Sequence, residues 1–353
     1  NNLNYKYDYL GRLTSKDIND NKIVEYKYIT DGNKTSTIID NVIIGNDVYK
    51  YNYDKLYNIT DIYLNNDLIN HYEYNSFNEL IKEDNYKYNK TYKYIYDSEE
   101  NIKRKEEYEL NSEVLIKSDI YSYENSNWED QLTKYNDTSI SYDNIGNPLV
   151  IGDNSLEWIN GRELKRYSNN KLDIEYRYNK DGIRIGKVID NKETDTLQYT
   201  KYYIENNKII FEETNNNVIY YIRDEEGSLI GLKYNNMIYY YIKNIQEDII
   251  GLMDSNYNLV CSYEYDSWGS IISIKDNNNN EITDTSHIGL INPYRYRSYY
   301  YDTETKLYYL NSRYYNPEWG RFINADNYVN TKQGMLSTNM FVYTENKSNR
   351  KSR

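Results

Sequence analysis

Tyrosine alternates with polar residues in one short phrase that recurs along the chain. The second aromatic residue of each phrase falls at Tyr7, Tyr28, Tyr53, Tyr74, Tyr96, Tyr123, Tyr142, Trp158 and Tyr178. The steps between these positions average about 21 residues, within the range of repeat architectures. Alternation with a period of two places the rings on one face of a β-strand and the charged residues on the other. The pattern therefore predicts a series of half-buried strands.

A turn signal follows each phrase. The clearest copies are Tyr5–Leu13, Tyr51–Ile59, Tyr72–Leu80 and Tyr263–Ile271. In these copies an Asp or Asn can bond to its own backbone and open the turn, and a Gly or Asn three residues later can adopt the positive φ that closes a bulged hairpin. Because a single hairpin is only marginally stable, we expect the units to join edge to edge in one long antiparallel sheet. A two-layer sandwich would show the same alternation.

The composition supports an ordered all-β chain. Forty-eight of the 353 residues are Tyr, against four Phe. A buried Tyr ring removes roughly 150–250 Å² from water while its hydroxyl still finds a polar partner. Three Pro, 15 Gly and 27% charged residues are typical of neither a disordered nor a collagen-like chain.

Charge and residue counts limit the candidate chemistry. The net charge of −13 argues against nucleic acid as a partner. Cys261 stands alone, so an intramolecular disulfide is excluded, and His71 and His287 are too few for a His/Cys zinc site. We therefore expect neither a metal nor another cofactor.

The sequence holds no apolar run of 18 residues and no signal peptide, so we expect no membrane span. The chain begins inside a repeat, which we interpret as a piece of a longer polypeptide whose export signal lies upstream. A nucleophile elbow, a P-loop, a zinc-protease motif and a dinucleotide fingerprint are also absent from the sequence. Any catalytic group must therefore come from the carboxylates.

The last third of the sequence carries a denser motif. It begins near Tyr239, passes through the Tyr263 repeat, and continues from Asn292 to Asp326 with Asp302, Glu304, Gly320, Arg321 and Phe322 as its core motif. This block resembles the Rhs repeat-associated core domain, and the repeats before it resemble the tyrosine–aspartate (YD) repeats of Rhs, wall-associated and toxin-complex C proteins. We accordingly divide the chain into a YD-repeat hairpin array at 1–238, a core block at 239–326 and a divergent C-terminal tail at 327–353.

The resemblance implies more than the residue pattern does. It implies a sheet that spirals into part of a hollow shell, closed at one end by the core block and enclosing a variable C-terminal toxin. The implied partners are an upstream shell region of the same polypeptide and that toxin domain, and the implied location is secreted or at the cell surface. The expected function is thus a non-catalytic shell and closure segment of a secreted polymorphic toxin.

The resemblance also implies catalytic residues, because the core of this family acts as an aspartyl autoprotease. Its Arg corresponds to Arg313 and its first Asp to Asp326, whereas no Asp follows Asp326 in this sequence. Aspartyl chemistry needs two carboxylates that share a proton. We therefore expect that the chain does not cleave itself, and we favour a structural Arg–Asp pair over catalysis.

The sequence departs from the family pattern at two places. Lys306 stands where the family has Gly, and a left-handed Lys costs roughly 1 kcal/mol, so a rearranged turn is possible here. The tail after the 339–343 segment is basic and rich in Ser and Asn, typical of a frayed terminus.

Two alternative functions remain. A cell-wall or carbohydrate-binding repeat array is the first alternative, and an active autoprotease that releases a downstream toxin is the second.

Overall fold

The computed structural model describes residues 2–32, 34–215, 217–326 and 339–343. Most of the predicted C-terminal tail, 327–338 and 344–353, lies outside the described residues. The division into domains at 238 and 326 stays a prediction.

One antiparallel sheet of 26 strands makes up most of the molecule, and each strand pairs with the next one in sequence. Its first strands are β1 (Leu3–Tyr7), β2 (Leu13–Ile18), β3 (Asn21–Asp31), β4 (Lys34–Ile44), β5 (Asp47–Tyr53), β6 (Ile59–Leu64), β7 (Asp67–Tyr74), β8 (Leu80–Asn85) and β9 (Lys90–Tyr96). The next are β10 (Ile102–Glu109), β11 (Leu115–Ser122), β12 (Lys134–Tyr135), β13 (Thr138–Tyr142), β14 (Pro148–Ile151), β15 (Asn154–Ile159), β16 (Glu163–Ser168), β17 (Leu172–Tyr178) and β18 (Arg184–Asn191). The last are β19 (Thr196–Glu205), β20 (Lys208–Thr214), β21 (Asn217–Arg223), β22 (Leu229–Tyr234), β23 (Met237–Lys243), β24 (Ile249–Met253), β25 (Leu259–Tyr265) and β26 (Ile271–Asp276). The predicted all-β fold with a long antiparallel hairpin sheet is confirmed.

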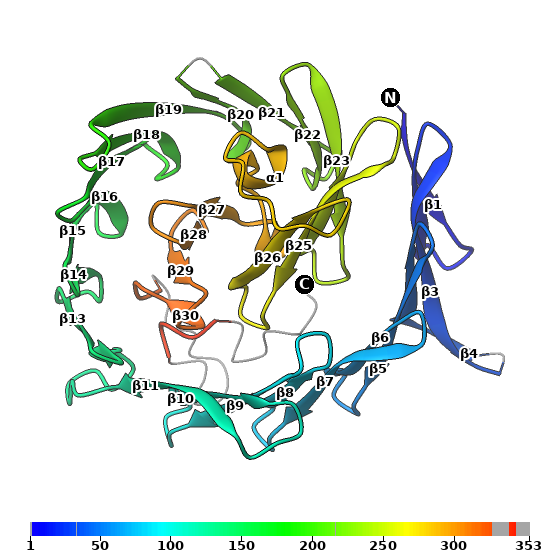
Figure 1. Ribbon diagram of the computed structural model, residues 1–353, viewed down its shortest axis with the longest axis horizontal. Helices are drawn as coiled ribbons and strands as arrows, with labels where there is room; N and C mark the ends of the chain where they lie inside the picture. Colours follow the sequence, from blue (N-terminus) through cyan, green and yellow to red (C-terminus); the bar gives the residue numbers. More distant parts are fainter. Residues whose placement is uncertain (1, 33, 216, 327–338, 344–353) are drawn as a thin grey trace.

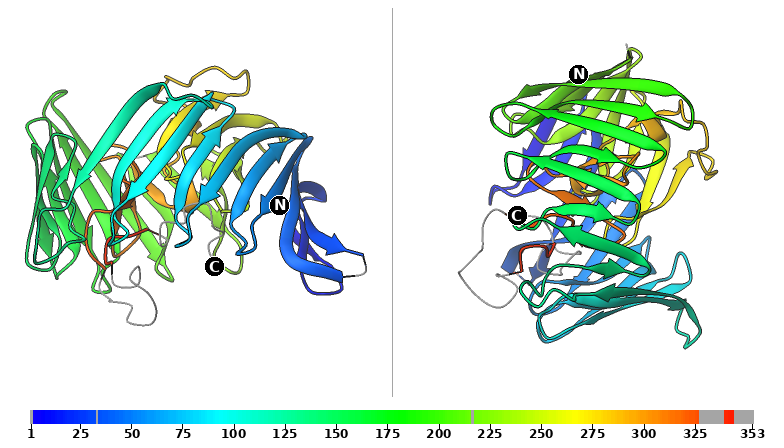
Figure 2. Two further views of the ribbon diagram at one scale, coloured as in Figure 1. Left: turned by 90° about the horizontal axis from the view of Figure 1, so that it is seen from below. Right: turned by 90° about the vertical axis from the view of Figure 1, so that its left-hand side faces the viewer.

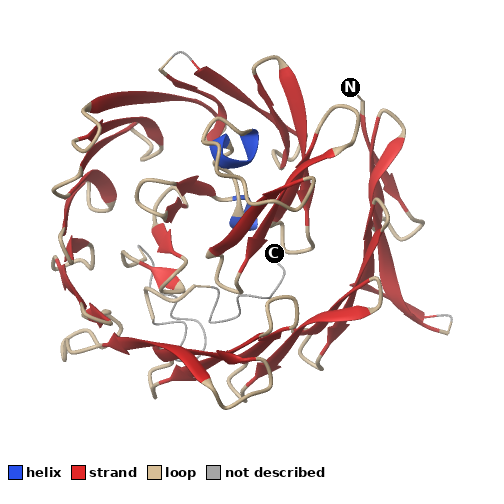
Figure 3. Ribbon diagram, viewed as in Figure 1, coloured by secondary structure: helices blue, strands red, loops and turns tan. Residues whose placement is uncertain are grey.

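A second, small sheet follows. It consists of β27 (Tyr300–Asp302), β28 (Leu307–Tyr309), β29 (Tyr314–Asn316) and β30 (Arg321–Phe322). Between the two sheets lie the short helix α1 (Ile288–Ile291) and the 3-10 turn η1 (Tyr296–Ser298). Figure 3 shows that strands and loops otherwise dominate the described chain.

The turns use the predicted chemistry. In the first hairpin the carboxylate of Asp8 accepts hydrogen bonds from the backbone N–H of Leu10 and Arg12, at 2.9 and 3.0 Å. Gly11, three residues after Asp8, has a φ of +75°. The strand pairing shifts register directly before the second Tyr of the phrase, for example between Lys6 and Tyr7, which is the predicted bulge.

The prediction of Gly or Asn at the left-handed position is wrong in the hairpin that Asp54 opens. There Tyr57 adopts a φ of +64°. The Asn58 side chain is buried instead, and its amide donates to Asp54 at 2.8 Å. Asn58 therefore stabilises the turn through its buried side chain, and the exposed Tyr57 adopts the strained backbone conformation.

The second ring of each phrase is an anchor between repeats. From the second phrase on, its polar atom donates to a backbone carbonyl in, or just before, the second strand of the preceding hairpin. The donor–acceptor pairs are Tyr28–Leu13, Tyr53–Ile39, Tyr74–Ile59, Tyr96–Leu80, Tyr123–Ile102, Tyr142–Leu132, Trp158–Pro148, Tyr178–Leu164 and Tyr265–Ile249, at 2.7–3.0 Å. We call this series the anchor ladder. Each bond gives a backbone carbonyl of the neighbouring hairpin a side-chain partner.

The sheet curves into a spiral. Figure 1 shows the strands following one another around a ring, with the last ones, β24–β26, turning inward past the first ones. Figure 2 shows the same strip from two sides, with tilted strands lying side by side. The inner face holds the main core, a continuous cluster that runs from Val24 through Leu164 to Tyr343. The predicted spiral is therefore confirmed.

Candidate functional site

The block from α1 to β30 lies inside the curve of the large sheet (Figure 1). Its strands are short and its rings are buried: Tyr308 and Tyr315 are 0% exposed, and Tyr314 is 1% exposed. We call residues 288–326 the inner block, and the large sheet around it the wall. The contacts between the inner block and the wall fix the position of the inner block.

Asp302 of the inner block forms a fully buried ion pair with Arg184 of β18 in the wall. Both side chains are 0% exposed, and the two guanidinium nitrogens lie 2.6 and 3.0 Å from the carboxylate oxygens. Lys187 reaches the same carboxylate at 3.0 Å and also pairs with Glu304. Burial raises the pKa of Asp302, but Arg184 and Lys187 outweigh it and hold the pKa below its ordinary value.

Four aromatic rings enclose the Arg184 guanidinium. Tyr176 and Tyr202 come from the wall, while Tyr300 and Tyr309 come from the inner block, and their centroids lie 4.2–5.2 Å from the guanidinium carbon. Such contacts strengthen when water is excluded. The arrangement, which we call the arginine lock, joins the wall to the inner block through charge and aromatic contacts together.

A second contact is the turn between β25 and β26. Its Trp268 is 1% exposed, and three Tyr hydroxyls of the inner block donate to the backbone carbonyls of this turn. The pairs are Tyr296–Ser267, Tyr308–Gly269 and Tyr315–Trp268, at 3.1, 3.0 and 2.7 Å. Gly320 of the core motif lies against the Trp268 ring, where an added Cβ would come within 2.9 Å of it. The close contact between the backbone at position 320 and the Trp268 ring requires a glycine.

Arg321 and Phe322 of the core motif are buried as well. Arg321 bonds to the Tyr123 hydroxyl, an anchor of the ladder, and to the Asp130 carbonyl at 2.5 Å. The guanidinium carbon of Arg313 lies over the Phe322 ring, 3.6 Å from the centroid of that ring. Arg321 thus fixes the end of the inner block to the wall, whereas Phe322 packs within the inner block.

The two residues matched to the family's catalytic positions lie together. Arg313 Nη1 is 2.9 Å from Asp326 Oδ2, and the side chains are 23% and 33% exposed. Burial lowers the pKa of Arg313, while Asp326 opposes that shift. Wall residues hold the segment before the pair, since Ala325 N donates to Gly146 O at 3.1 Å. The catalytic assignment of Arg313 and Asp326 stays a prediction.

Sequence reasoning missed Arg184 and Lys187. On an alternating strand a cation is normally assigned to the solvent face. The sequence gives only a weak indication that Arg184 and Lys187 face inward. Arg184 stands between Ile183 and Ile185 in a stretch that also carries Gly182 and Gly186, which is the one local irregularity that could have been noticed.

Lys306, by contrast, keeps the left-handed turn that its position requires. Its φ is +59°, and its N–H donates to Asp302 O at 2.8 Å. The turn is therefore not rearranged by the loss of glycine, and the lysine accepts the strain.

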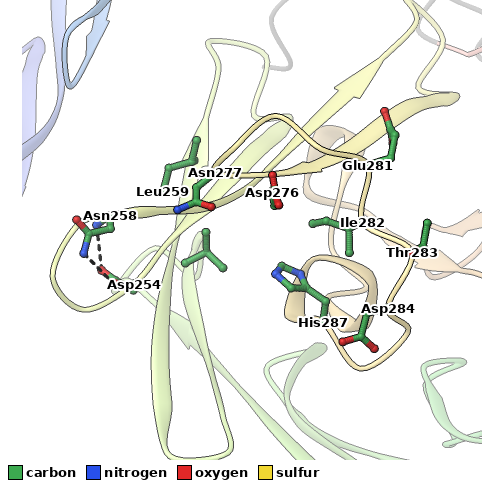
Figure 4. A pocket seen from close by; sticks show the side chains of 11 residues that line it. Asp254, Asn258, Leu259, Asp276, Asn277, Glu281, Ile282, Thr283, Asp284 and His287 are labelled. Carbon is green, nitrogen blue, oxygen red and sulfur yellow. Dashed lines mark hydrogen bonds between the residues drawn. The ribbon is translucent and has the colours of Figure 1, made fainter.

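A concave surface of about 710 Å³ lies elsewhere, beside α1. Figure 4 shows carboxylates and His287 around it. Asp254 and Asp276 each accept hydrogen bonds from their own turns, and Asp284 accepts from Ser286. Within the part of the chain that the structure describes, no group of three or more His, Cys, Asp or Glu side chains is arranged for a metal ion. These carboxylates stabilise turns.

Comparison with known proteins places this architecture. No family model matches the chain. The tRNA nuclease WapA of Bacillus subtilis strain 168 is 30% identical over 280 residues, which cover 77% of this chain and 11% of WapA. The tRNA3(Ser)-specific nuclease WapA of Bacillus spizizenii is 29% identical over 280 residues, with the same two coverages.

Solved structures share the whole fold. A chain in the Photorhabdus luminescens Tc holotoxin pore with mutated TccC3 matches 98% of this chain at a TM-score of 0.74 and 15% identity, over 18% of its own length. The crystal structure of TcdB2–TccC3 matches 98% at a TM-score of 0.70 and 15% identity, over 20% of its own length. The chain belongs to the Rhs (YD-repeat) proteins.

This Rhs chain spans about 11% of the length of the WapA relatives that it matches. The shared fold includes the spiral sheet and the block inside it. Among the described residues of the Rhs chain, no helix is long and apolar enough to cross a membrane.

Proposed function

We propose that this Rhs chain is a shell and closure segment of a secreted or cell-surface polymorphic toxin. The wall forms part of an enclosure, and the inner block closes one end of it. Its partners are an upstream shell region of the same polypeptide and a toxin domain that follows the inner block in full-length relatives. The names of the WapA relatives assign nuclease activity to those proteins, and this chain spans a small part of them.

The arginine lock carries this proposal. A buried carboxylate of the inner block meets a buried guanidinium of the wall, so the inner block cannot leave without exposing two uncompensated charges. A chain segment that continues from the inner block therefore starts from a fixed point inside the curve of the sheet. Such a tether suits a container better than a flat binding array.

The test is a fusion that places a protease-sensitive reporter after residue 353. We expect the reporter to be digested several-fold more slowly in the fusion than when free, and Asp302→Asn to abolish that protection. Asp153→Asn is the matched control, because Asp153 lies in an exposed turn between β14 and β15. Equal digestion of the free and the fused reporter would refute the proposal.

We further propose that the Arg313–Asp326 pair is structural in this chain, so that the chain does not cleave itself. The pair is direct at 2.9 Å, and the Arg313 guanidinium is also engaged on the Phe322 ring. The intact mass of the same fusion tests this. Release of the reporter, abolished by Asp326→Asn, would establish the autoprotease instead.

Binding to glucan or choline resin distinguishes the carbohydrate-binding alternative. The shell hypothesis expects no retention on either resin.

A further inference from the structure

The last hairpin of the large sheet lies against much earlier strands of the same sheet. It consists of β25, β26 and the turn 266–270, and Figure 1 shows it inside the ring. We call it the closing hairpin. Its turn touches β9, where the Trp268 ring packs edge-on against the Tyr94 ring with 5.7 Å between centroids. Two further contacts join its side to the turn between β8 and β9: Lys87 pairs with Glu264, and the Tyr88 hydroxyl lies 3.3 Å from Ser273 Oγ.

Two carboxyl groups meet where the turn of the closing hairpin touches the wall. Glu83 of β8 is 1% exposed and accepts hydrogen bonds from Ser267 at 2.5 Å and from the Asn70 amide at 3.2 Å. Asp266, the residue before Ser267, is 8% exposed and lies 2.9 Å from Lys105 Nζ of β10. Two acids are thus buried beside one lysine.

The geometry indicates which of the two acids is ionised. Asp266 has Lys105 as its counter-ion, and its Oδ1 also accepts hydrogen bonds from the N–H groups of Trp268 and Ser270 at 2.9 and 2.8 Å. Among the described residues, Glu83 forms hydrogen bonds with neutral groups and no ion pair. A buried carboxyl group without a counter-ion holds a proton, and burial raises the pKa of Glu83 to about 7.

The other groups that face Glu83 bring no further cation. Three tyrosines of the neighbouring strands lie around it, and burial raises the pKa of each, so they stay neutral: Tyr72, Tyr92 and Tyr94. Two more carboxylates face Tyr92 and Lys105 and have lysines of their own: Glu107 pairs with Lys90 at 2.6 Å, and Asp119 pairs with Lys117 at 3.0 Å. With Glu83 ionised, the contact would hold three carboxylates against two ammonium groups: Glu83, Glu264 and Asp266 against Lys87 and Lys105.

We propose that the closing hairpin is a pH-sensitive switch in the enclosure: it stays docked on β8–β10 while Glu83 holds a proton, and it detaches when Glu83 ionises. Detachment returns Glu83 and Asp266 to water and ends the repulsion between them. Because the pKa of Glu83 is raised in the docked state, its contribution to docking is complete below the ordinary Glu pKa of about 4.3. That contribution is lost as the pH rises through about 7.

Detachment opens one side of the enclosure. Three Tyr hydroxyls bond the turn of the closing hairpin to the inner block, so the two move together. Arg184 and Lys187 hold the pKa of Asp302 below its ordinary value, so the arginine lock keeps its charges at neutral pH and the inner block stays tied to β18. The inference rests on the proposed shell function, because it names the condition under which the enclosure opens.

A thiol on the docked face reports detachment. Ser273→Cys places a thiol on β26 at a position that is 6% exposed and faces Tyr88. The native Cys261 of β25 packs against Gly289 and is 0% exposed, so it stays covered when the hairpin and the inner block move together. Peptide mass spectrometry measures labelling of both thiols by a methanethiosulfonate in one sample. A short unstructured cysteine peptide corrects the rates for the thiolate fraction at each pH.

We expect corrected labelling at position 273 to be about tenfold faster at pH 8 than at pH 6, and labelling of Cys261 to stay slow at both. Glu83→Gln keeps the shape of the side chain without its charge and should abolish the rise, whereas the exposed Glu99→Gln should leave it unchanged.

Labelling at position 273 that does not change with pH, or that rises equally in Glu83→Gln, would overturn the inference. A parallel rise at Cys261 would overturn it as well, because that result indicates unfolding of the whole chain. The thiol measurement needs no fused reporter, so the switch and the shell function can fail separately.

Discussion

The hydroxyl of Tyr178 lies 2.8 Å from the hydroxyl of Tyr314, and this hydrogen bond joins the anchor ladder of the wall to the core of the inner block, as the bond between Tyr123 and Arg321 does elsewhere. Tyr178 also donates to the Leu164 carbonyl at 2.9 Å, as the other anchors do within their repeats. One tyrosine therefore links repeat to repeat and wall to inner block.

Removing that hydroxyl should be costly. Tyr178→Phe leaves the Leu164 carbonyl and the Tyr314 hydroxyl without this partner in a buried setting. We expect the free energy of unfolding to fall by about 1–3 kcal/mol. Urea unfolding measures the change, and Tyr220→Phe on the exposed outer face is the control, expected to stay within about 0.5 kcal/mol of the parent.

The arginine lock predicts a larger loss. Asp302→Asn leaves Arg184 buried without its full counter-charge, which should destabilise the fold by about 3–5 kcal/mol. The double variant Arg184→Met with Asp302→Leu removes both charges and should lose much less. Thermal unfolding of the three proteins measures this, and an equal loss in the single and double variants would contradict a charge-based lock.

The same lock sets an acid limit. Because the pKa of Asp302 is lowered in the fold, its contribution to stability is present above the ordinary Asp pKa of about 4 and is lost as the pH falls through the lowered value. We expect unfolding below pH 4 to be steeper in the parent chain than in the double variant.

Glu83 predicts the opposite pH dependence. Burial raises the pKa of Glu83 to about 7, and the nearby Asp266 carboxylate adds to the rise, whereas the bond that Ser267 donates to Glu83 at 2.5 Å opposes it. The folded chain holds a proton that the unfolded chain releases, so stability falls as the pH rises from the ordinary Glu pKa toward 7. Glu83→Gln should raise the free energy of unfolding by about 3 kcal/mol at pH 8 and change little at pH 4. The exposed Glu99→Gln serves as the control and should show no such pH dependence.

Lys306 offers a local gain. At a φ of +59° a glycine relieves the backbone strain of the lysine, so Lys306→Gly should stabilise the chain by about 1 kcal/mol. Lys306→Ala keeps a Cβ at the same φ and should give no gain. A rise in the thermal midpoint for Ala as large as that for Gly would show that the lysine side chain, not the backbone, carries the strain.

The sequence could predict what depends on local repetition. Alternating Tyr and polar residues, the Asp8 turn and its Gly11 follow from strand geometry and backbone φ, and each hairpin repeats them. The arginine lock could not be predicted in this way. Arg184 and Asp302 are far apart in the sequence, and only the inward curl of the sheet brings them together.

The core motif shows the same limit from the other side. Resemblance singled out Gly320 and Arg321, but their physical reasons are the Trp268 ring and the Tyr123 hydroxyl, which lie on distant repeats. Tyr57 illustrates a smaller failure of the sequence prediction. The Asn58 side chain is buried, and the residue before it, Tyr57, adopts the left-handed conformation that was expected for Gly or Asn.

The anchor ladder has a direction. Every anchor reaches back to a carbonyl that precedes it in the chain, from Tyr28 to Leu13 through to Tyr265 to Ile249. A hairpin newly made on the ribosome therefore brings the bond that secures the hairpin made just before it, and needs nothing that has not yet been synthesised. The wall can therefore fold in the order of translation. The inner block is synthesised after the wall strands, so Arg184 is in place before Asp302 is made.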